Sequence, residues 1–151
     1  GDRGDSDSYL CLVCVLKGAF PFFSTLCDEL ALASVPFEVD FIRAKSYLGT
    51  SSGALEISTL GLGEVATKGE YSNKDVIIVE DIIDTGKTMT KLVSKFKNEG
   101  VKTVLPVSLL DKRDVKGSVR NFGHYMAGFS IADEFVVGFG LDYNERFRDI
   151  K

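Results

Sequence analysis

The feature that most limits the fold is a repeated pairing of a short apolar run with a stretch of helical periodicity. The almost wholly apolar run Tyr9–Leu16 predicts a strand covered on both faces, as in a parallel sheet. A helix opened by Pro21 should follow, with apolar positions at Phe22, Phe23, Leu26, Cys27 and Leu30. The run Val76–Val79 starts a second pair, whose helix has apolar positions at Met89, Leu92, Val93 and Phe96 and ends at Gly100. This alternation predicts an α/β fold, an open and mostly parallel twisted sheet with helices on both faces.

Further strands are expected at Pro36–Ser46, Val101–Leu110, Tyr125–Ile131 and Phe135–Leu141. Pro106 cannot donate a hydrogen bond to a neighbouring strand, which indicates a bulge or an edge position within its run. The Gly/Ser/Thr-rich stretch after Tyr47 predicts a long loop, and loops of that length are usually functional or mobile.

The chain has 151 residues, which is the size of one ordinary domain. We expect residues 9–151 to form that domain and the polar, acidic residues 1–8 to form a tail. A hydrophobic content of 44% and a charged content of 26% are typical of globular domains rather than disordered or fibrous chains.

Charge and hydropathy limit the classes of partner. The formal net charge of −4 argues against a broad nucleic-acid surface, which needs an excess of Lys and Arg. No apolar run approaches the ~20 residues that span a bilayer, so we expect no membrane association and a cytoplasmic location. Cys11 and Cys14 are three positions apart in a predicted strand, where they point to opposite faces, so a shared metal or redox site is not expected.

The segment from Val76 to Thr90 carries the clearest chemical signal. The predicted strand ends in two acids, Glu80 and Asp81, and a turn with Gly86 leads into the helix. Ligands bind at this end of strands in open parallel sheets. The Gly-Lys-Thr suggests a nucleotide P-loop, but that motif needs a glycine five places before Gly86, where Asp81 stands.

The two parts of this segment favour two different ligand groups. Carboxylates at Glu80 and Asp81 can accept hydrogen bonds from a sugar diol or hold Mg²⁺, whereas they would repel a triphosphate. Backbone N–H groups at Thr85, Gly86 and Thr88, at a helix N-terminus, can cradle one phosphate. A diol beside a phosphate corresponds to a ribose 5-phosphate.

The same segment resembles the motif of the type I phosphoribosyltransferases that binds 5-phosphoribosyl-1-pyrophosphate (PRPP), and it is most similar to the hypoxanthine-guanine branch of that family. The other family signatures resemble Leu16-Lys17-Gly18, Ser46-Tyr47, Leu109–Arg113 and Phe135–Asp149, in the expected order. The resemblance covers nearly all of the chain after Ser8. It implies a Rossmann-like core and a purine-salvage enzyme that transfers the phosphoribosyl group of PRPP to hypoxanthine and/or guanine, giving IMP or GMP and pyrophosphate.

The resemblance also implies roles for particular residues. Asp84 would be the general base near the purine, and Glu80 and Asp81 would bind the ribose hydroxyls and Mg²⁺. The remaining implied ligands divide by substrate group: Thr85, Gly86, Lys87 and Thr88 for the 5-phosphate; Leu16, Lys17, Gly18 and Arg148 for pyrophosphate; Ile82, Lys112, Phe135 and Val136 for the purine. In the family the peptide between this Leu and Lys is often cis. Asp142 would face a second Mg²⁺, and Ser46 and Tyr47 would belong to a lid loop.

Two other functions are compatible with parts of the pattern. A catalytically weak regulator on the same fold would bind PRPP or a nucleotide, but it has no need of a carboxylate at Asp84. A receiver-type phosphorylation domain would place its paired acids near the chain start. Family members begin earlier and continue past Phe147-Arg148-Asp149, and those ends build a hood over the purine, so we expect a reduced hood. We also expect a homodimer or homotetramer.

Overall fold

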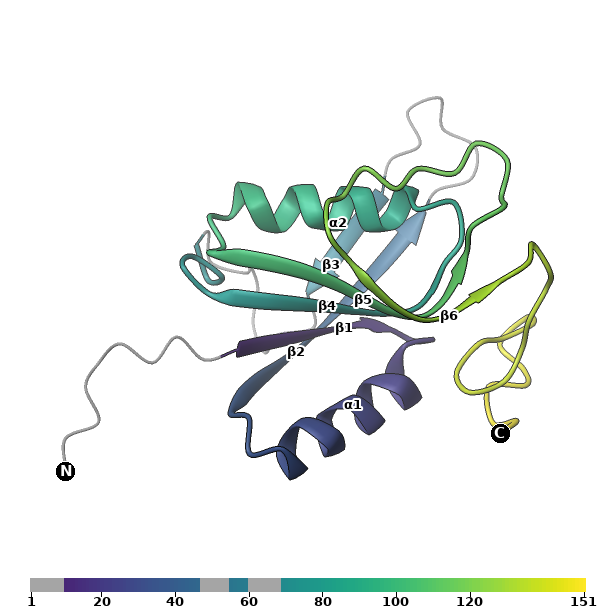
Figure 1. Ribbon diagram of the computed structural model, residues 1–151, viewed down its shortest axis with the longest axis horizontal. Helices are drawn as coiled ribbons and strands as arrows, with labels where there is room; N and C mark the ends of the chain where they lie inside the picture. The colour runs from purple at the N-terminus through teal and green to yellow at the C-terminus, as the bar shows by residue number, and fades with distance from the viewer. Residues whose placement is uncertain (1–9, 47–54, 60–68) are drawn as a thin grey trace, which may run out of the picture.

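The strands form one six-stranded sheet in the order β3-β2-β1-β4-β5-β6 (Figure 1). The computed structural model describes residues 10–46, 55–59 and 69–151. Within these residues, the strands are β1 (Leu10–Leu16), β2 (Phe37–Ser46), β3 (Leu55–Thr59), β4 (Asp75–Ile83), β5 (Thr103–Lys112) and β6 (Met126–Ile131). Neighbouring strands run parallel except for β2 and β3, which are antiparallel. The predicted open, mostly parallel sheet is therefore confirmed.

Two helices cover opposite faces of this sheet, as predicted (Figure 1). Helix α1 (Phe20–Leu32) has its proline in the first turn, where the missing N–H has no intrahelical partner to lose. Helix α2 (Lys87–Asn98) buries Met89, Leu92, Val93 and Phe96, the four positions that the periodicity indicated. None of the helices in the described part of the chain is long and apolar enough to cross a membrane.

The central strand β1 separates two apolar layers. Its residues Cys11, Val13 and Val15 pack in the cluster that includes the buried face of α2. Leu12 and Cys14 pack on the other side with Phe23 of α1. Because alternate residues face opposite layers, Cys11 and Cys14 are kept apart, which confirms the sequence-based prediction.

Three sequence-based predictions about strands and loops need correction. The stretch after Tyr47 is not one continuous loop, because β3 lies within it and pairs with the end of β2. The strand predicted at Val76–Val79 does end in Glu80 and Asp81 as expected, but β4 continues two residues further, to Ile83. The run Phe135–Leu141 is not a strand: residues such as Phe139 and Gly140 have positive φ, which produces turns joined by isolated bridges and single backbone hydrogen bonds.

Pro106 also occupies a different place from the expected bulge or edge strand. β5 lies inside the sheet, between β4 and β6. Pairing with β6 begins only at Val107, so Pro106 lies just outside the part of β5 that has a β6 neighbour. One side of the strand can therefore accommodate a residue that has no N–H.

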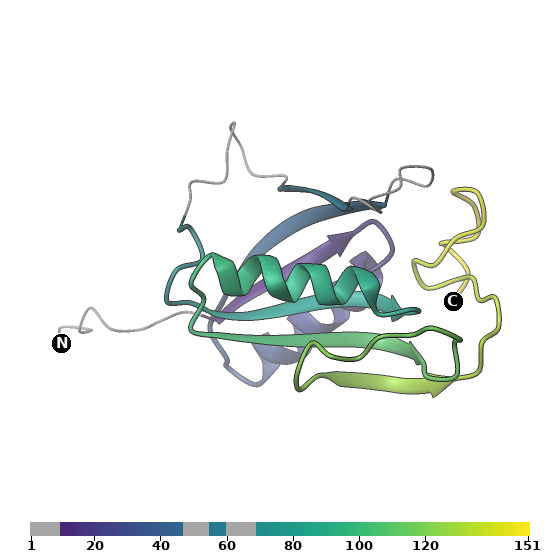
Figure 2. The same cartoon turned by 90° about the horizontal axis from the view of Figure 1, so that it is seen from above.

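The order of the crossovers places a ligand site between β1 and β4. The chain leaves β1 through α1 toward β2, and it leaves β4 through α2 toward β5, in the opposite direction along the sheet. Such a reversal opens a crevice at the carboxyl ends of the two central strands. The C-terminal segment, residues 132–151, lies beyond these strand ends (Figures 1 and 2).

Candidate active site

A cavity of about 250 Å³ lies at the carboxyl ends of β1 and β4. Most of its lining was predicted from the sequence, namely Leu16, Gly18, Glu80, Asp81, Ile82, Asp84, Thr85, Gly86 and Thr88. The sequence had not indicated four other lining residues, Val15, Ala44, Ile83 and Met89. The fold therefore brings the β1–α1 loop and the β4–α2 turn to one crevice, as the strand order requires.

Glu80 and Asp81 place two adjacent carboxyl groups in this cavity. Burial of Glu80 raises its pKa well above the usual value, and the neighbouring charge of Asp81 raises it further. Asp81 packs against the backbone of Gly18, where a Cβ would collide with the Asp81 carboxylate. The carboxyl oxygens suit a sugar diol and are also the hard donors that Mg²⁺ prefers when substrate completes its coordination.

The turn after β4 is shaped by Gly86, which precedes α2 with a φ of 80°. A Cβ there would collide with the carbonyl oxygen of Val119, from the loop between β5 and β6. The amide of Val119 donates to the Thr85 carbonyl at 2.6 Å, which ties that loop to the turn. The first N–H groups of α2 have no intrahelical acceptor, so the turn provides donors suited to an anion.

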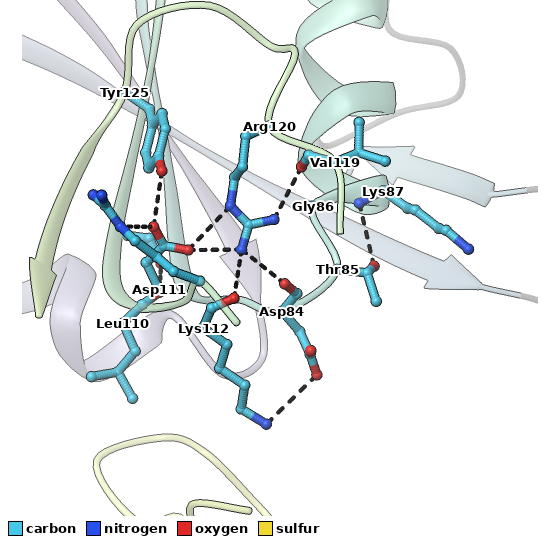
Figure 3. Close-up of polar contacts among 12 residues, drawn as sticks. Asp84, Thr85, Gly86, Lys87, Leu110, Asp111, Lys112, Val119, Arg120 and Tyr125 are labelled. Atoms are coloured by element: carbon cyan, nitrogen blue, oxygen red, sulfur yellow. Dashed lines mark hydrogen bonds and ion pairs between the residues drawn. The ribbon is translucent and has the colours of Figure 1, made fainter. Parts of the chain in front are cut away.

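Lys87 contributes to this turn differently from its neighbours. Its side chain is exposed, points away from Asp84 and lies outside the cavity lining (Figure 3). The backbone amide of Lys87 donates a hydrogen bond to the Thr85 hydroxyl at 3.4 Å. The Lys87 side chain is therefore not brought to the cavity with the other residues expected at the phosphate.

The residues expected to meet pyrophosphate come from opposite ends of the chain. The peptide between Leu16 and Lys17 is cis, as the family resemblance implied. Glu145 bridges the two cations, with its Oε2 2.9 Å from Lys17 Nζ and its Oε1 3.2 Å from Arg148 Nη2. Arg148 also pairs with Asp142 at 3.3 Å. Lys17, Arg148 and Asp142 thus form one ion-pair network with Glu145, a residue that the sequence did not single out.

Lys112 lies at the end of β5 with its side chain about 10% exposed. Its Nζ is 3.8 Å from Asp84 and 3.6 Å from Asp133. The Lys112–Asp84 ion pair therefore brings the predicted general base next to a predicted purine ligand (Figure 3).

The other predicted purine ligands and the lid are less closely joined to the cavity. Phe135 is 72% exposed, and its ring meets Tyr143 edge to face at 5.7 Å between centroids. Val136 is half-buried, and neither residue is part of the cavity lining. Ser46 is the last residue of β2, and Tyr47 lies outside the described residues.

A buried polar cluster beside Asp84 was not predicted (Figure 3). Asp111 is fully buried and pairs with Arg120 at 2.8 Å, while the hydroxyl of Tyr125 donates to it at 2.9 Å. The sequence did offer one indication of this cluster, the acid Asp111 within an apolar strand, because a buried charge needs a cationic or hydrogen-bonding partner.

The metal site expected from the resemblance is only partly preformed. In residues 10–46, 55–59 and 69–151, no group of three or more His, Cys, Asp or Glu side chains could hold a metal ion. Asp142 already accepts a hydrogen bond from the Glu145 amide at 2.7 Å and pairs with Arg148. The adjacent Glu80 and Asp81 fit a Mg²⁺ ion whose remaining ligands come from substrate and water.

Comparison with known proteins agrees with this geometry. The phosphoribosyl transferase domain family matches residues 3–144. The chain is 45% identical over 145 residues to a hypoxanthine-guanine phosphoribosyltransferase of Schistosoma mansoni, covering 92% of this chain and 49% of the relative. It is 43% identical over 150 residues to the human protein of the same name, covering 94% and 65%. The chain thus spans about half to two thirds of the length of these relatives.

A solved structure shows the same fold. Hypoxanthine phosphoribosyltransferase from Trypanosoma cruzi, in complex with the product IMP, superposes with a TM-score of 0.80 at 34% sequence identity. That match covers 96% of this chain and 73% of the other. With the family match extending over most of its length, the chain belongs to the phosphoribosyltransferase family and has the type I fold.

Proposed function

We propose that this chain is the catalytic core of a purine-salvage enzyme that transfers the 5-phosphoribosyl group of PRPP to hypoxanthine or guanine. The products are IMP or GMP and pyrophosphate. The observation that carries the proposal is the single cavity that contains the acid pair Glu80 and Asp81, the turn at Gly86, and Asp84. The similar proteins named as hypoxanthine-guanine phosphoribosyltransferases support the same reaction.

In this proposal the cavity binds the ribose 5-phosphate portion of PRPP. Glu80 and Asp81 accept hydrogen bonds from the ribose hydroxyls, and the backbone at Thr85, Gly86, Lys87 and Thr88 holds the phosphate. In this proposal the two acids and the backbone turn are in place before substrate binds, so binding needs little reorganisation of the protein.

The purine lies on the side of the cavity where Asp84 and Lys112 meet. Asp84 takes or shares the proton at one imidazole nitrogen while the other nitrogen attacks the anomeric carbon. Lys112 donates to the 6-oxygen, and its charge is already held near Asp84 at 3.8 Å. Ile82 lines the cavity, Phe135 stacks on the base, and Val136 contacts its edge in this proposal.

The leaving pyrophosphate is assigned to Lys17, Arg148 and the backbone of Leu16 and Gly18. Positive charge at Lys17 and Arg148 stabilises the negative charge that builds as the bond to the anomeric carbon breaks. Glu80, Asp81 and Asp142 are the carboxylates that would hold Mg²⁺, which when bound supplies Lewis-acid stabilisation of the same charge. Ser46 and Tyr47 are proposed to belong to a lid that excludes water.

A turnover assay with PRPP, Mg²⁺ and each purine base, followed by absorbance, tests the proposal. We expect conversion of hypoxanthine or guanine and negligible use of adenine. Lys112 can only donate, so it suits a 6-oxygen and opposes a 6-amino group, and such mismatches discriminate by ~10⁴ or more. Binding of PRPP without turnover would favour a binding-only regulator, and efficient use of adenine would contradict the substrate class.

Location and assembly are also proposals. Cys11, Cys14 and Cys27 are all free, which fits a reducing compartment such as the cytoplasm. A homodimer or homotetramer stays a prediction, and sedimentation of the protein measures it directly.

A further inference from the structure

Arg120 contacts two parts of the candidate site, the residue that follows β4 and the end of β5 (Figure 3). Its Nη2 donates to the carbonyl of Asp84 at 2.9 Å and to the carbonyl of Lys112 at 2.8 Å. The same guanidinium group donates to Asp111 Oδ1 from Nε at 3.2 Å and from Nη2 at 2.8 Å. One side chain therefore joins the end of β4 to the end of β5, beside the two residues assigned to the purine.

The guanidinium group is itself held in place by a buried carboxylate. Asp111 has no exposed side-chain surface, and its Oδ2 accepts hydrogen bonds from Tyr125 at 2.9 Å and Arg113 at 3.2 Å. A buried carboxylate is costly unless it is paired and hydrogen-bonded, so these contacts stabilise one arrangement strongly. Asp111 thus fixes the orientation of the Arg120 guanidinium group, and this orientation directs it at the carbonyls of Asp84 and Lys112.

The residue before Arg120 holds the phosphate turn. The Val119 amide donates to the Thr85 carbonyl at 2.6 Å, and the Val119 carbonyl lies where a Cβ of Gly86 would be. Arg120 also donates to that carbonyl, from Nη1 at 3.0 Å. Two consecutive residues therefore connect the phosphate turn with the Asp84–Lys112 pair.

We propose that Arg120 is a positioning residue that sets the spacing between Asp84 and Lys112. It acts through their carbonyl oxygens, so the base and the donor to the 6-oxygen stay at the two ends of one purine. This inference rests on the function proposed above. A planar guanidinium can bridge two carbonyls and a carboxylate at once, whereas a lysine ammonium offers one point charge.

The sharpest test compares Arg120→Gln with Arg113→Gln. Both variants remove an arginine that contacts Asp111, but the Arg113 side chain is mostly exposed and meets Asp111 Oδ2 through its Nε at 3.2 Å. Misplacement of reacting groups by about 1 Å can cost ~10² in rate. We expect kcat with hypoxanthine to fall by ~10²-fold in Arg120→Gln and by less than ~3-fold in Arg113→Gln.

Three readouts separate positioning from general stability. In Arg120→Gln the KM for PRPP should rise by a smaller factor than kcat falls, because Glu80 and Asp81 lie in β4 and the Val119 amide can still hold the turn at Thr85. The preference for hypoxanthine over adenine should narrow. Arg120→Lys should restore the charge and the melting temperature while kcat stays low. Equal losses with every substrate, or full rescue by Arg120→Lys, would overturn the inference.

Hydrogen exchange tests the same inference without turnover. In Arg120→Gln, amides of residues 84–88 and 112–113 should exchange faster while those of α1 are unchanged, and unchanged exchange at the site would overturn the inference. If wild-type protein shows no turnover but Arg120→Gln still loosens these amides, the proposed function fails and the role of Arg120 stands. Should Arg120→Gln not fold, Tyr125→Phe removes only one contact to Asp111 and should loosen the same amides to a smaller extent.

Discussion

The two halves of the candidate site are built in different ways. The segment from Glu80 to Thr88 is continuous in sequence and is held between a buried strand and the start of α2. The C-terminal segment, residues 132–151, contains no helix and no strand, and all of it is described. It is fixed by isolated bridges, backbone contacts such as Phe139 to Ile150 at 2.7 Å, and ion pairs at Glu145 and Arg148.

This difference matches the groups that each half is proposed to bind. The bond between the ribose and the 5-phosphate is not broken in the reaction, and this part of the substrate meets backbone N–H groups and the carboxyl groups of Glu80 and Asp81. The purine and pyrophosphate bond to the anomeric carbon in turn, and in the C-terminal segment they meet exposed side chains such as Phe135. Regions with few buried contacts open at lower free energy, so the C-terminal half can adjust while the β4–α2 half stays fixed.

Replacing Gly86 should break the fixed half most severely. Gly86→Ala places a Cβ onto the Val119 carbonyl at a φ of 80°, so the turn must move. We expect calorimetry to show at least ~10²-fold weaker PRPP binding in a folded protein, because the turn's N–H groups lose their common direction. Gly117→Ala is the control, since its φ of 74° brings similar strain but nothing lies within 4 Å of the new Cβ. Unchanged affinity in Gly86→Ala would show that this turn is not the phosphate site.

Asp84→Asn should separate chemistry from binding within the same half. Loss of a general base typically costs ~10²–10⁴ in rate, so kcat with hypoxanthine should fall by that factor while PRPP affinity is kept. Asp133→Asn is the matched control, because Asp133 is the other carboxylate near Lys112, at 3.6 Å. Steady-state rates for both variants decide the assignment, and a wild-type kcat in Asp84→Asn would exclude Asp84 as the base.

Glu80→Gln should reveal a smaller effect, on stability rather than on rate. Burial raises the pKa of Glu80 in the folded state, so folding is favoured while the group is protonated and loses that contribution as pH rises through the raised pKa. The neutral variant carries no such loss. Its melting temperature should exceed that of the wild type at pH 8, with the difference vanishing near pH 4. Equal melting temperatures of the wild type and Glu80→Gln at both pH values would show that the buried Glu80 carboxylate does not destabilise the folded protein.

The fixed half could be predicted from sequence because its signals are local. The apolar run before Glu80, the turn at Gly86 and the periodicity of α2 are adjacent in the chain, and each depends on short-range geometry. The same rules failed where local pattern and tertiary contacts disagree. Phe135–Leu141 has the composition of a strand, but Gly138 and Gly140 take positive φ and Gly140 packs onto the Gly18 carbonyl.

The contacts of Arg120 show the remaining limit. Asp111 in a buried strand signals that a partner exists, but Arg113, Lys116 and Arg120 all follow it within the same loop. Only the path of that loop over α2 selects Arg120 for the carbonyls of Asp84 and Lys112. Glu145 is a similar case, because its two cationic partners include Lys17 from the opposite end of the chain.

Glu145→Gln should give the smallest effect and test the adjustable half. Glu145 bridges Lys17 and Arg148, the two cations proposed to meet pyrophosphate, and hydrogen bonds from Lys17 and then Arg148 lower its pKa. Its carboxylate therefore competes with pyrophosphate for the same charges and must be displaced on binding. A neutral amide competes less, so calorimetry should show a few-fold higher pyrophosphate affinity without a change in melting temperature, because exposed ion pairs contribute little to stability. The gain should shrink at high salt, which screens exposed charges.

Glu38→Gln is the control, since Glu38 pairs with Lys74 at 2.8 Å near the start of β2, at the opposite end of the sheet from the site. Equal pyrophosphate affinity in the wild type and Glu145→Gln would mean that Lys17 and Arg148 do not bind pyrophosphate together, and the adjustable half would need a different assignment.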